Sequence, residues 1–258
     1  MTLLKNINFS DYQAIKAINI SSLKELKKSP EHFRSAIDYP REASEAQVLG
    51  SALHRMILEP DLFENDYYVL PNIDRRTKAG KEQYTSIVEA NLNLTPIPEA
   101  DYKVLQGTYK SFQKSPNWST LYQTKHLVEQ PFTFNWLGVE CKGQADMICE
   151  ASGEYALVDL KTTSNFFGFK HEIKKYGYLD QLAWYGKGLE LNGMQMSKYY
   201  LVAIEKSYPY KIAVWKIQKE VINHSMLANE KLLLEYKARC EHEDWTSDLV
   251  YNFGLNDL

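Results

Sequence analysis

The chain has 258 residues, of which 44% are hydrophobic and 24% are charged, and its formal net charge is −3. These values are ordinary for a globular protein with one sizeable core, and the small negative charge excludes a surface that attracts nucleic acid everywhere. No run of about 18 apolar residues is present and the amino terminus lacks the basic and apolar regions of a signal peptide, so neither a membrane span nor export is expected.

The first half of the chain is predicted to be mainly helical. Residues 1–43 show helical patterns, and Ser29 followed by Pro30 is typical of a helix start. Apolar residues at helical spacing predict further helices over residues 44–59, 77–91 and 98–114. Residues 63–70 are predicted to form a strand, and the run Thr95-Pro96-Ile97-Pro98 indicates a break between the last two helices.

In the second half the hydrophobic period changes to that of strands. Three strands joined by turns at Leu137-Gly138 and Ser152-Gly153 are predicted over residues 126–136, 139–150 and 154–163. They are followed by helices over 168–175 and 178–191, strands over 198–205 and 210–218, and a long amphipathic helix over 219–240. We therefore expect one α/β domain over residues 1–258, with a mainly helical part (1–120), a core (121–240) and an acidic tail (241–258).

The most informative motif is Asp159-Leu160-Lys161, at the end of a short apolar run in the strand predicted over residues 154–163. Side chains alternate along a strand, so Asp159 and Lys161 point the same way while Leu160 faces the core. A second carboxylate, Asp146, lies thirteen residues before Asp159. Carboxylates are hard ligands for Mg²⁺ and an adjacent ammonium can position an attacking water, so the set suggests metal-assisted phosphodiester hydrolysis. The alternative for the Asp-x-Lys pair alone is a solvated pair on an edge strand.

These residues resemble a known series of motifs. Gly143-Gln144-Ala145-Asp146, then Asp159-Leu160-Lys161, then Gln181 and Tyr185 on one helical face are similar to the motifs of the PD-(D/E)xK nuclease superfamily, in its RecB-like branch. Residues 21–33, 50–60 and 176–178 resemble the corresponding segments of RecE-type exonucleases (exodeoxyribonuclease VIII). The resemblance covers roughly residues 20–220 and implies a restriction-endonuclease-like α/β core, with a mixed central β-sheet flanked by helices. The alternative for the helical pair alone is an exposed polar pair.

Carried over residue by residue, the resemblance implies a metal site. The implied ligands are His54, Asp146, Asp159 and the backbone carbonyl of Leu160, and the implied cofactor is Mg²⁺, two ions per site, for which Mn²⁺ would substitute. His54 falls at the flank of an apolar helical stripe, where a histidine can also be a satisfied residue at the edge of the core. Gly50 on the same helix costs about 1 kcal/mol relative to Ala, which favours the interpretation that something approaches this helix closely.

The resemblance also implies which residues would carry catalysis. Lys161 would position the nucleophilic water, and Gln181 and Tyr185 would orient Lys161 and contact the DNA backbone. Glu129, in a predicted strand, matches an acidic position that contacts the metal indirectly or binds a second ion. One departure from the family is Asp180, because a neutral residue or a histidine is more usual before the Gln.

Binding of nucleic acid by a chain of net charge −3 requires a local basic surface. Two clusters qualify, one with Arg75, Arg76, Lys78 and Lys81 and the other with Lys170, Lys174 and Lys175. Phe166, Phe167 and Phe169 lie next to the second cluster. This loop is therefore expected to hold a DNA end by its charge and by wedging rings between bases. The alternative for either cluster is a solvated face.

The activity that the resemblance implies is Mg²⁺-dependent 5′-to-3′ exonuclease action on double-stranded DNA ends, which exposes a 3′ single strand for recombination. It also implies a ring-shaped homo-oligomer, a single-strand annealing partner of the RecT kind, and work in the cytoplasm of a bacterium or a phage-infected host. The alternatives are a structure-specific endonuclease on the same core and a non-catalytic DNA-binding member of the fold.

Three cysteines without metal spacing, Cys141, Cys149 and Cys240, are too few for an iron–sulfur cluster.

Overall fold

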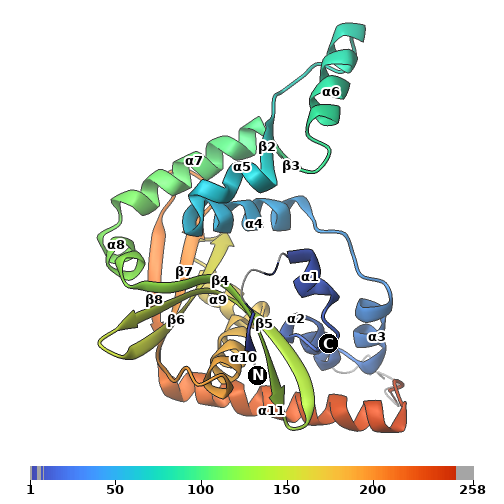
Figure 1. The fold of residues 1–258 in the computed structure, drawn as a ribbon, viewed down its shortest axis with the longest axis vertical. Coiled ribbons are helices and arrows are strands. Elements are labelled where there is room, and N and C mark those ends of the chain that lie inside the picture. Colours follow the sequence, from blue (N-terminus) through green and yellow to red (C-terminus); the bar gives the residue numbers. More distant parts are fainter. Residues whose placement is uncertain (1, 5–6, 8, 248–258) are drawn as a thin grey trace, which may run out of the picture.

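Figure 1 shows the fold of the protein in a computed structural model that describes residues 2–4, 7 and 9–247. Most of the expected acidic tail, residues 248–258, therefore lies outside the described residues. Within the part of the chain that is described, no helix is both long enough and apolar enough to span a membrane.

The centre of the molecule is a six-stranded sheet in the order β1, β4, β5, β6, β7, β8. Neighbouring strands are antiparallel except β6 and β7, which are parallel. The strands are β1 (Thr2–Leu3), β4 (Lys125–Trp136), β5 (Val139–Ala151), β6 (Glu154–Thr163), β7 (Met196–Glu205) and β8 (Ile212–Ile217). The expected α/β fold with a mixed central sheet is confirmed.

Tight turns join the three longest strands, as the sequence predicts. Leu137 and Gly138, with φ angles of 57° and 81°, connect β4 to β5, and Ser152 and Gly153, with φ angles of 56° and 78°, connect β5 to β6. Two successive residues with positive φ give a turn whose twist matches that of the flanking strands. Strands β4, β5 and β6 therefore form one continuous antiparallel meander.

Helices cover both faces of the sheet, and each face has its own apolar core. The first core lies under α2 (Ile20–Leu23), η1 (Lys24–Lys27), α3 (Pro30–Asp38), α9 (Phe169–Lys175), α10 (Tyr178–Leu191) and α11 (Lys219–His242). The second core lies under α4 (Glu45–Leu58), α5 (Phe63–Asp66), α7 (Glu99–Lys114) and α8 (Pro116–Gln123). Along β6, Leu157 belongs to the first core, whereas Ala156, Val158 and Leu160 belong to the second, which confirms the predicted alternation.

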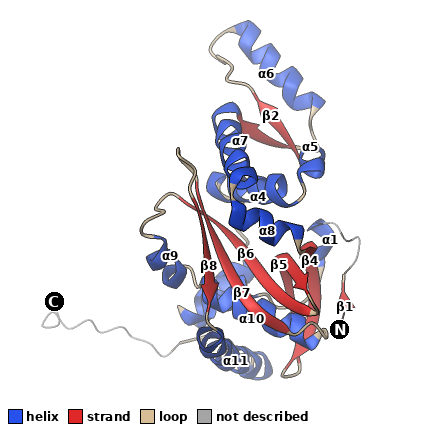
Figure 2. Cartoon of the chain, turned by 90° about the vertical axis from the view of Figure 1, so that its left-hand side faces the viewer, coloured by secondary structure: helices blue, strands red, loops and turns tan. Residues whose placement is uncertain are grey.

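A projection extends from the side of the second core. Strands β2 (Tyr67–Leu70) and β3 (Thr95–Pro98) pair in parallel, and α6 (Lys78–Ala90) between them points away from the body in both Figure 1 and Figure 2. Among the described residues, neither core includes a residue of α6.

A buried lysine fastens the first helix to the sheet. Lys142 of β5 is 5% exposed, and its ammonium donates to the carbonyl oxygens of Tyr12, Gln13 and Ile15 at 3.1, 2.9 and 2.9 Å, at the end of α1 (Phe9–Ala14). The carbonyls of Tyr12 and Ile15 also accept the backbone N–H groups of Ile15 and Ala17, at 3.3 and 2.9 Å, so the ammonium shares its acceptors with the turns that end α1. Burial lowers the pKa of Lys142.

The strand predicted over residues 63–70 is only half correct. Residues 63–66 form α5, because Phe63 turns inward and is buried in the second core, and the strand begins at Tyr67. The run Thr95–Pro98 is not only a break, since it forms β3 and buries Ile97.

Helix α8 was not predicted, although the sequence carries a start signal for it. The Ser115 hydroxyl accepts the backbone N–H of Trp118, and Pro116 occupies the first turn. The same Ser-Pro signal at Ser29 correctly predicts α3, whose N-cap it is.

Candidate active site

The sheet divides at the motif residues. The ladder between β5 and β6 ends with the pair Met147 and Val158, and Asp146 and Asp159 are the next residues on each strand. Beyond this point β5 stays paired with β4, and β6 with β7. We call this opening the fork. The two carboxylates therefore lie at the first positions where the strands separate.

The fork frees backbone groups of Leu160. Its N–H is donated to Oδ2 of Asp146 at 2.7 Å, and its carbonyl oxygen lies 3.1 Å from Nε2 of His54. A carbonyl oxygen can only accept, so Nε2 of His54 is the donor in this contact and Nδ1 is the nitrogen that faces the carboxylates. The predicted ligand Leu160 thus lies in contact with two other predicted ligands.

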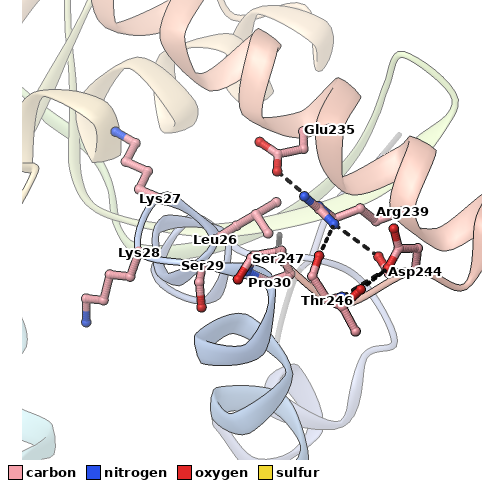
Figure 3. A pocket seen from close by; sticks show the side chains of 10 residues that line it. All are labelled: Leu26, Lys27, Lys28, Ser29, Pro30, Glu235, Arg239, Asp244, Thr246 and Ser247. Atoms are coloured by element: carbon pink, nitrogen blue, oxygen red, sulfur yellow. Dashed lines mark hydrogen bonds and ion pairs between the residues drawn. The ribbon is translucent and has the colours of Figure 1, made fainter. Parts of the chain in front are cut away.

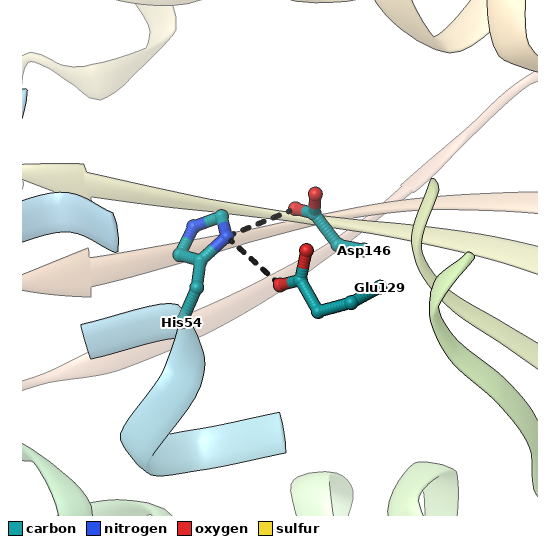
Figure 4. A group of neighbouring side chains, drawn as sticks. All are labelled: His54, Glu129 and Asp146. Carbon is teal, nitrogen blue, oxygen red and sulfur yellow. Dashed lines mark ion pairs between the residues drawn. The ribbon is translucent and has the colours of Figure 1, made fainter. Parts of the chain in front are cut away.

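His54, Glu129 and Asp146 meet at the fork from three elements, α4, β4 and β5 (Figure 4). One ligand atom from each lies within 4.8 Å of the others, and Nδ1 of His54 is 3.7 Å from both Oε1 of Glu129 and Oδ2 of Asp146. Burial lowers the pKa of His54, but the carboxylates of Asp146 and Glu129 outweigh it and raise the pKa to about 9. The two carboxylates thus favour the protonated form of the imidazole.

Glu129 is held in this position by its backbone and by a neighbour. Its φ angle is 44°, which is uncommon for a residue other than glycine, and it lies between the ladder pairs that β4 makes through Val128 and Gln130. The amide of Gln144 donates to its Oε2 at 2.7 Å. The structure therefore brings Glu129 to 3.7 Å from the predicted ligand His54 and within 4.8 Å of the predicted ligand Asp146.

Asp159 and Lys161 form a buried pair on β6. Their Oδ2 and Nζ atoms are 2.6 Å apart, and Asp159 is only 1% exposed, so the alternative of a solvated edge pair is wrong. Burial raises the pKa of Asp159 to about 6 although Lys161 lowers it. Burial lowers the pKa of Lys161, and the carboxylates of Asp159 and Asp146 outweigh this and raise it. Lys161 is therefore held as an ammonium.

The residues at the fork fit a hard divalent cation. Oδ1 of Asp159 is buried and has no hydrogen-bond partner among the described residues, which is costly for a carboxylate unless something else satisfies it. The group whose ligand atoms come together is His54, Glu129 and Asp146, and carboxylate oxygens with an imidazole are ligand types that Mg²⁺ and Mn²⁺ accept. The predicted ligand Asp159 is not part of this group, because its carboxylate pairs with Lys161.

The predicted helical pair, Gln181 and Tyr185, lies on α10, on the side of the sheet that holds the first core. The Gln181 amide donates to the Tyr185 hydroxyl at 2.8 Å, and Tyr185 is 9% exposed, so the alternative of an exposed polar pair is wrong. Burial, followed by the charges of Asp159 and Asp146, raises the pKa of Tyr185 well above its usual range. The aromatic ring against Lys161 belongs instead to Tyr178, whose centroid is 5.3 Å from Nζ. The sequence places Tyr178 only in the segment that leads into the helical motif.

The structure explains the motif residues Gly143 and Asp180 but not Gly50. An added Cβ at Gly143 would lie 2.6 Å from the Phe132 ring and 3.0 Å from Tyr185, so this position of the motif needs glycine for close packing. At Gly50 the nearest atom would be Oγ1 of Thr162 at 3.8 Å, an ordinary contact, so the expected close approach is not found there. Asp180, the departure from the family pattern, forms an ion pair with Lys27 at 2.6 Å.

The predicted DNA-binding residues lie apart from one another. Lys170, Lys174 and Lys175 are exposed on α9, whereas Arg75 and Arg76 lie in the loop that leads into the projecting α6. Arg76 pairs with Asp74 at 2.8 Å and Arg75 lies over the ring of Tyr84.

Of the three neighbouring phenylalanines, the expected wedge is reduced to one. Phe169 is fully buried and Phe166 packs against the first core, whereas Phe167 is 83% exposed. Phe169 begins α9 and fills the core beneath it, so it is unable to contact a ligand at the surface.

A hollow of about 340 Å³ lies at the end of α11, and Figure 3 shows the residues that line it: Leu26, Lys27, Lys28, Ser29, Pro30, Glu235, Arg239, Asp244, Thr246 and Ser247. The Arg239 guanidinium bonds to Glu235 and to the carbonyls of Asp244 and Thr246. Its donors are therefore used to hold the segment after α11, and the hollow shares no residue with the fork.

Comparisons with known proteins agree with this architecture. A family model described as a "PDDEXK-like domain of unknown function (DUF3799)" matches residues 19–248. The crystal structure of a "putative exonuclease" from Eubacterium rectale is similar, with a TM-score of 0.63 and 13% identity over 94% of this chain and 88% of that one. The structure of SSO0001 is 18% identical over 82% of this chain and 85% of that one, but its TM-score of 0.32 is too low to indicate a shared fold. No curated protein matches the chain.

Proposed function

We propose, from the premise that this chain belongs to the PDDEXK-like domain family, that it is a metal-dependent deoxyribonuclease whose active site is the fork. One observation carries the proposal. His54, Glu129 and Asp146 place ligand atoms within 4.8 Å of one another, and the buried Asp159 holds the Lys161 ammonium at 2.6 Å on the adjacent strand. A metal site beside a fixed ammonium is suited to metal-assisted hydrolysis of a phosphodiester.

His54, Asp146, Asp159 and Glu129 are the residues that would hold the metal, with the Leu160 carbonyl beside them. Bound Mg²⁺ would polarise a phosphoryl oxygen and lower the pKa of a coordinated water. Lys161 positions the attacking water and stabilises negative charge as it develops on the phosphate. Asp159 fixes Lys161 in its charged form, and the Tyr178 ring limits where the ammonium can move.

The finer part of the proposal is a RecE-type exonuclease that degrades double-stranded DNA ends from 5′ to 3′ and leaves a 3′ single strand for recombination. Its support is the resemblance of residues 21–33, 50–60 and 176–178 to that group, together with the presence of every implied ligand. The ring-shaped homo-oligomer and the annealing partner of the RecT kind belong to the same proposal and have the same support.

The test is digestion of linear and covalently closed circular duplexes of one sequence with Mg²⁺, Mn²⁺ or EDTA. We expect metal-dependent loss of the linear duplex alone, with nucleotides released first from a 5′ label. Cutting of the closed circle would favour a structure-specific endonuclease. DNA binding without any hydrolysis, in Mg²⁺ and in Mn²⁺, would favour a non-catalytic member of the fold and would overturn the proposal.

A further inference from the structure

We propose that two loops beside the fork form a binding surface for single-stranded DNA, in which exposed aromatic rings stack on unpaired bases. The surface consists of Phe167 in the loop after β6 and Lys206, Tyr208 and Lys211 in the loop after β7, and we call it the aromatic rim. The inference rests on the proposed function, because a nuclease that works from a duplex end has unpaired nucleotides next to its active site.

The two loops lie at the same edge of the sheet. Strands β6 and β7 are parallel, and their last pair joins Thr163 to Glu205. The backbone N–H of Lys206 then donates to the carbonyl of Thr163 at 3.0 Å. Thr163 is two residues after Lys161, which is about 7 Å along a strand. The aromatic rim therefore begins next to the ammonium of the fork, and Figure 2 shows the two loops together above α9.

The rings of the rim are exposed, although the loops around them are well fixed. Tyr208 is 86% and Phe167 is 83% exposed, the two highest values among the large hydrophobic residues described. The loop of Phe167 is pinned on one side by Thr163, whose hydroxyl accepts the Asn165 N–H at 2.9 Å, and on the other by the buried Phe169. Two large exposed rings on neighbouring fixed loops, unlike one exposed ring alone, form a surface that a ligand can cover.

The loop of Tyr208 is fixed from below. The Tyr210 ring packs against Gly107 of α7 so closely that a Cβ at Gly107 would lie 2.3 Å from it. The Lys211 N–H donates to the Glu205 carboxylate at 3.1 Å, and the Glu205 N–H donates to the Lys211 carbonyl at 2.9 Å. Tyr208 is thus presented at the tip of a closed turn, whose base is anchored to the body.

The lysines of the aromatic rim indicate the kind of ligand that it binds. The Lys211 ammonium lies 4.7 Å from the centroid of the Phe167 ring, and Lys206 is on the same loop as Tyr208. Sites that bind single strands combine two components, aromatic rings that stack on bases and ammonium groups that contact phosphates. In an intact duplex the base faces are already stacked, so the rings have no target there. The fit is to unpaired nucleotides and not to a duplex.

The test measures binding of a fluorescent oligothymidylate by anisotropy in EDTA, where no hydrolysis takes place. Replacing both rings, Phe167→Ala with Tyr208→Ala, should weaken binding by at least about tenfold, because each stacked ring contributes to affinity. Tyr39→Ala is the matched control, since Tyr39 is 77% exposed but belongs to the end of α3. The conservative pair Phe167→Tyr and Tyr208→Phe should retain affinity.

Rings and lysines should separate by salt dependence. Replacing the rings should leave the slope of log K against log salt unchanged. Lys206→Gln with Lys211→Gln should reduce it by about 1.4 if both ammonium groups contact phosphate. All of these side chains except the partly exposed Lys206 project into solvent, so thermal unfolding should be unaffected.

The outcomes distinguish the rim from the proposed function. Nuclease activity with oligonucleotide binding that the ring replacements do not weaken would overturn the rim alone. Ring-dependent binding without any nuclease activity would overturn the proposed function and leave the rim standing. Wild-type protein that does not bind the oligonucleotide, or that binds it no better than a blunt duplex, would also overturn the rim.

Discussion

Asp146 accepts the backbone N–H of Leu160 at 2.7 Å at the point where β5 and β6 stop pairing. A side chain thus replaces the next rung of the ladder. The same carboxylate oxygen is 3.7 Å from Nδ1 of His54, so Asp146 joins the two strands and also forms one side of the candidate metal site. Substitution of Asp146 therefore tests both the contact between the strands and the candidate metal site.

Asp146→Ala should abolish hydrolysis and should lower the free energy of unfolding by about 1–3 kcal/mol, because the buried N–H of Leu160 loses its acceptor. Asp146→Asn keeps an oxygen there and should lose activity with a smaller loss of stability. Metal-dependent digestion and denaturant unfolding of both variants provide the measurements. Near-normal activity in either would contradict the assignment of the fork.

Lys161→Ala should reduce the rate of hydrolysis by about 10²–10³, as expected for removal of one charged group that acts in the transition state. Binding of Mn²⁺, followed by calorimetry, should change much less, because Lys161 is not a ligand. Lys187→Ala is a suitable control, as this lysine pairs with Glu190 on α10. A variant that lost metal binding but kept its rate at saturating metal would contradict this role.

Gln144→Ala should weaken Mn²⁺ binding by about 10- to 100-fold while the fold is retained, because the Gln144 amide holds Glu129 toward the other ligands. Activity should recover in part at high metal concentration, which a loss of folding would not allow. Gln113→Ala, at an exposed position on α7, is the matched control. Unchanged affinity would show that Glu129 does not bind the metal.

Replacing Lys170, Lys174 and Lys175 together by Gln should weaken duplex binding and reduce the slope of log K against log salt by about 2.7, if each contacts one phosphate. Slow cleavage should persist at high enzyme concentration, because phosphate contacts position the duplex and perform no chemistry. The same change at Arg75, Arg76 and Lys78 gives the comparison. An unchanged slope would show that the α9 lysines are only a solvated face.

The stability of the wild type should fall between pH 5 and pH 2 more than that of Glu31→Gln. Hydrogen bonds from the Ser29 side chain, from the backbone and from Ser247 lower the pKa of Glu31 from 4.5 to about 2. A carboxyl with a depressed folded-state pKa stabilises the fold above its unfolded pKa, and this contribution is lost as the pH falls toward the folded value. Melting temperatures of the two proteins should therefore converge in acid. A constant difference from pH 5 to pH 2 would contradict the shift.

Local patterns made much of the fold predictable. Neighbouring residues determine the turns at Gly138 and Gly153, so the meander follows from the sequence. They also determine the alternation around Asp159, so the shared face of Asp159 and Lys161 follows too. The fork does not follow, because it depends on where β5 leaves β6 and on the contact that His54 of α4 makes there with Leu160, which is distant in sequence.

The burial of individual side chains also could not be predicted from the sequence. The adjacent rings Phe166, Phe167 and Phe169 are chemically equivalent in the sequence, and only the start of α9 determines that Phe169 is buried and Phe167 is exposed. Tyr178 was assigned only to the approach to the helical motif, since its contact with Lys161 joins α10 to β6. Helix α8 differs, because its start signal, Ser115-Pro116, is local in the sequence.

Lys142 has a consequence for where the folding unit begins. The family match starts at residue 19, yet the three acceptors of this buried ammonium are supplied by Tyr12, Gln13 and Ile15. A protein trimmed to the matched region would keep the side chains at the fork but would leave a charge without acceptors inside β5, four residues from Asp146. The acceptors that this buried charge uses therefore lie outside the matched region, on its amino-terminal side.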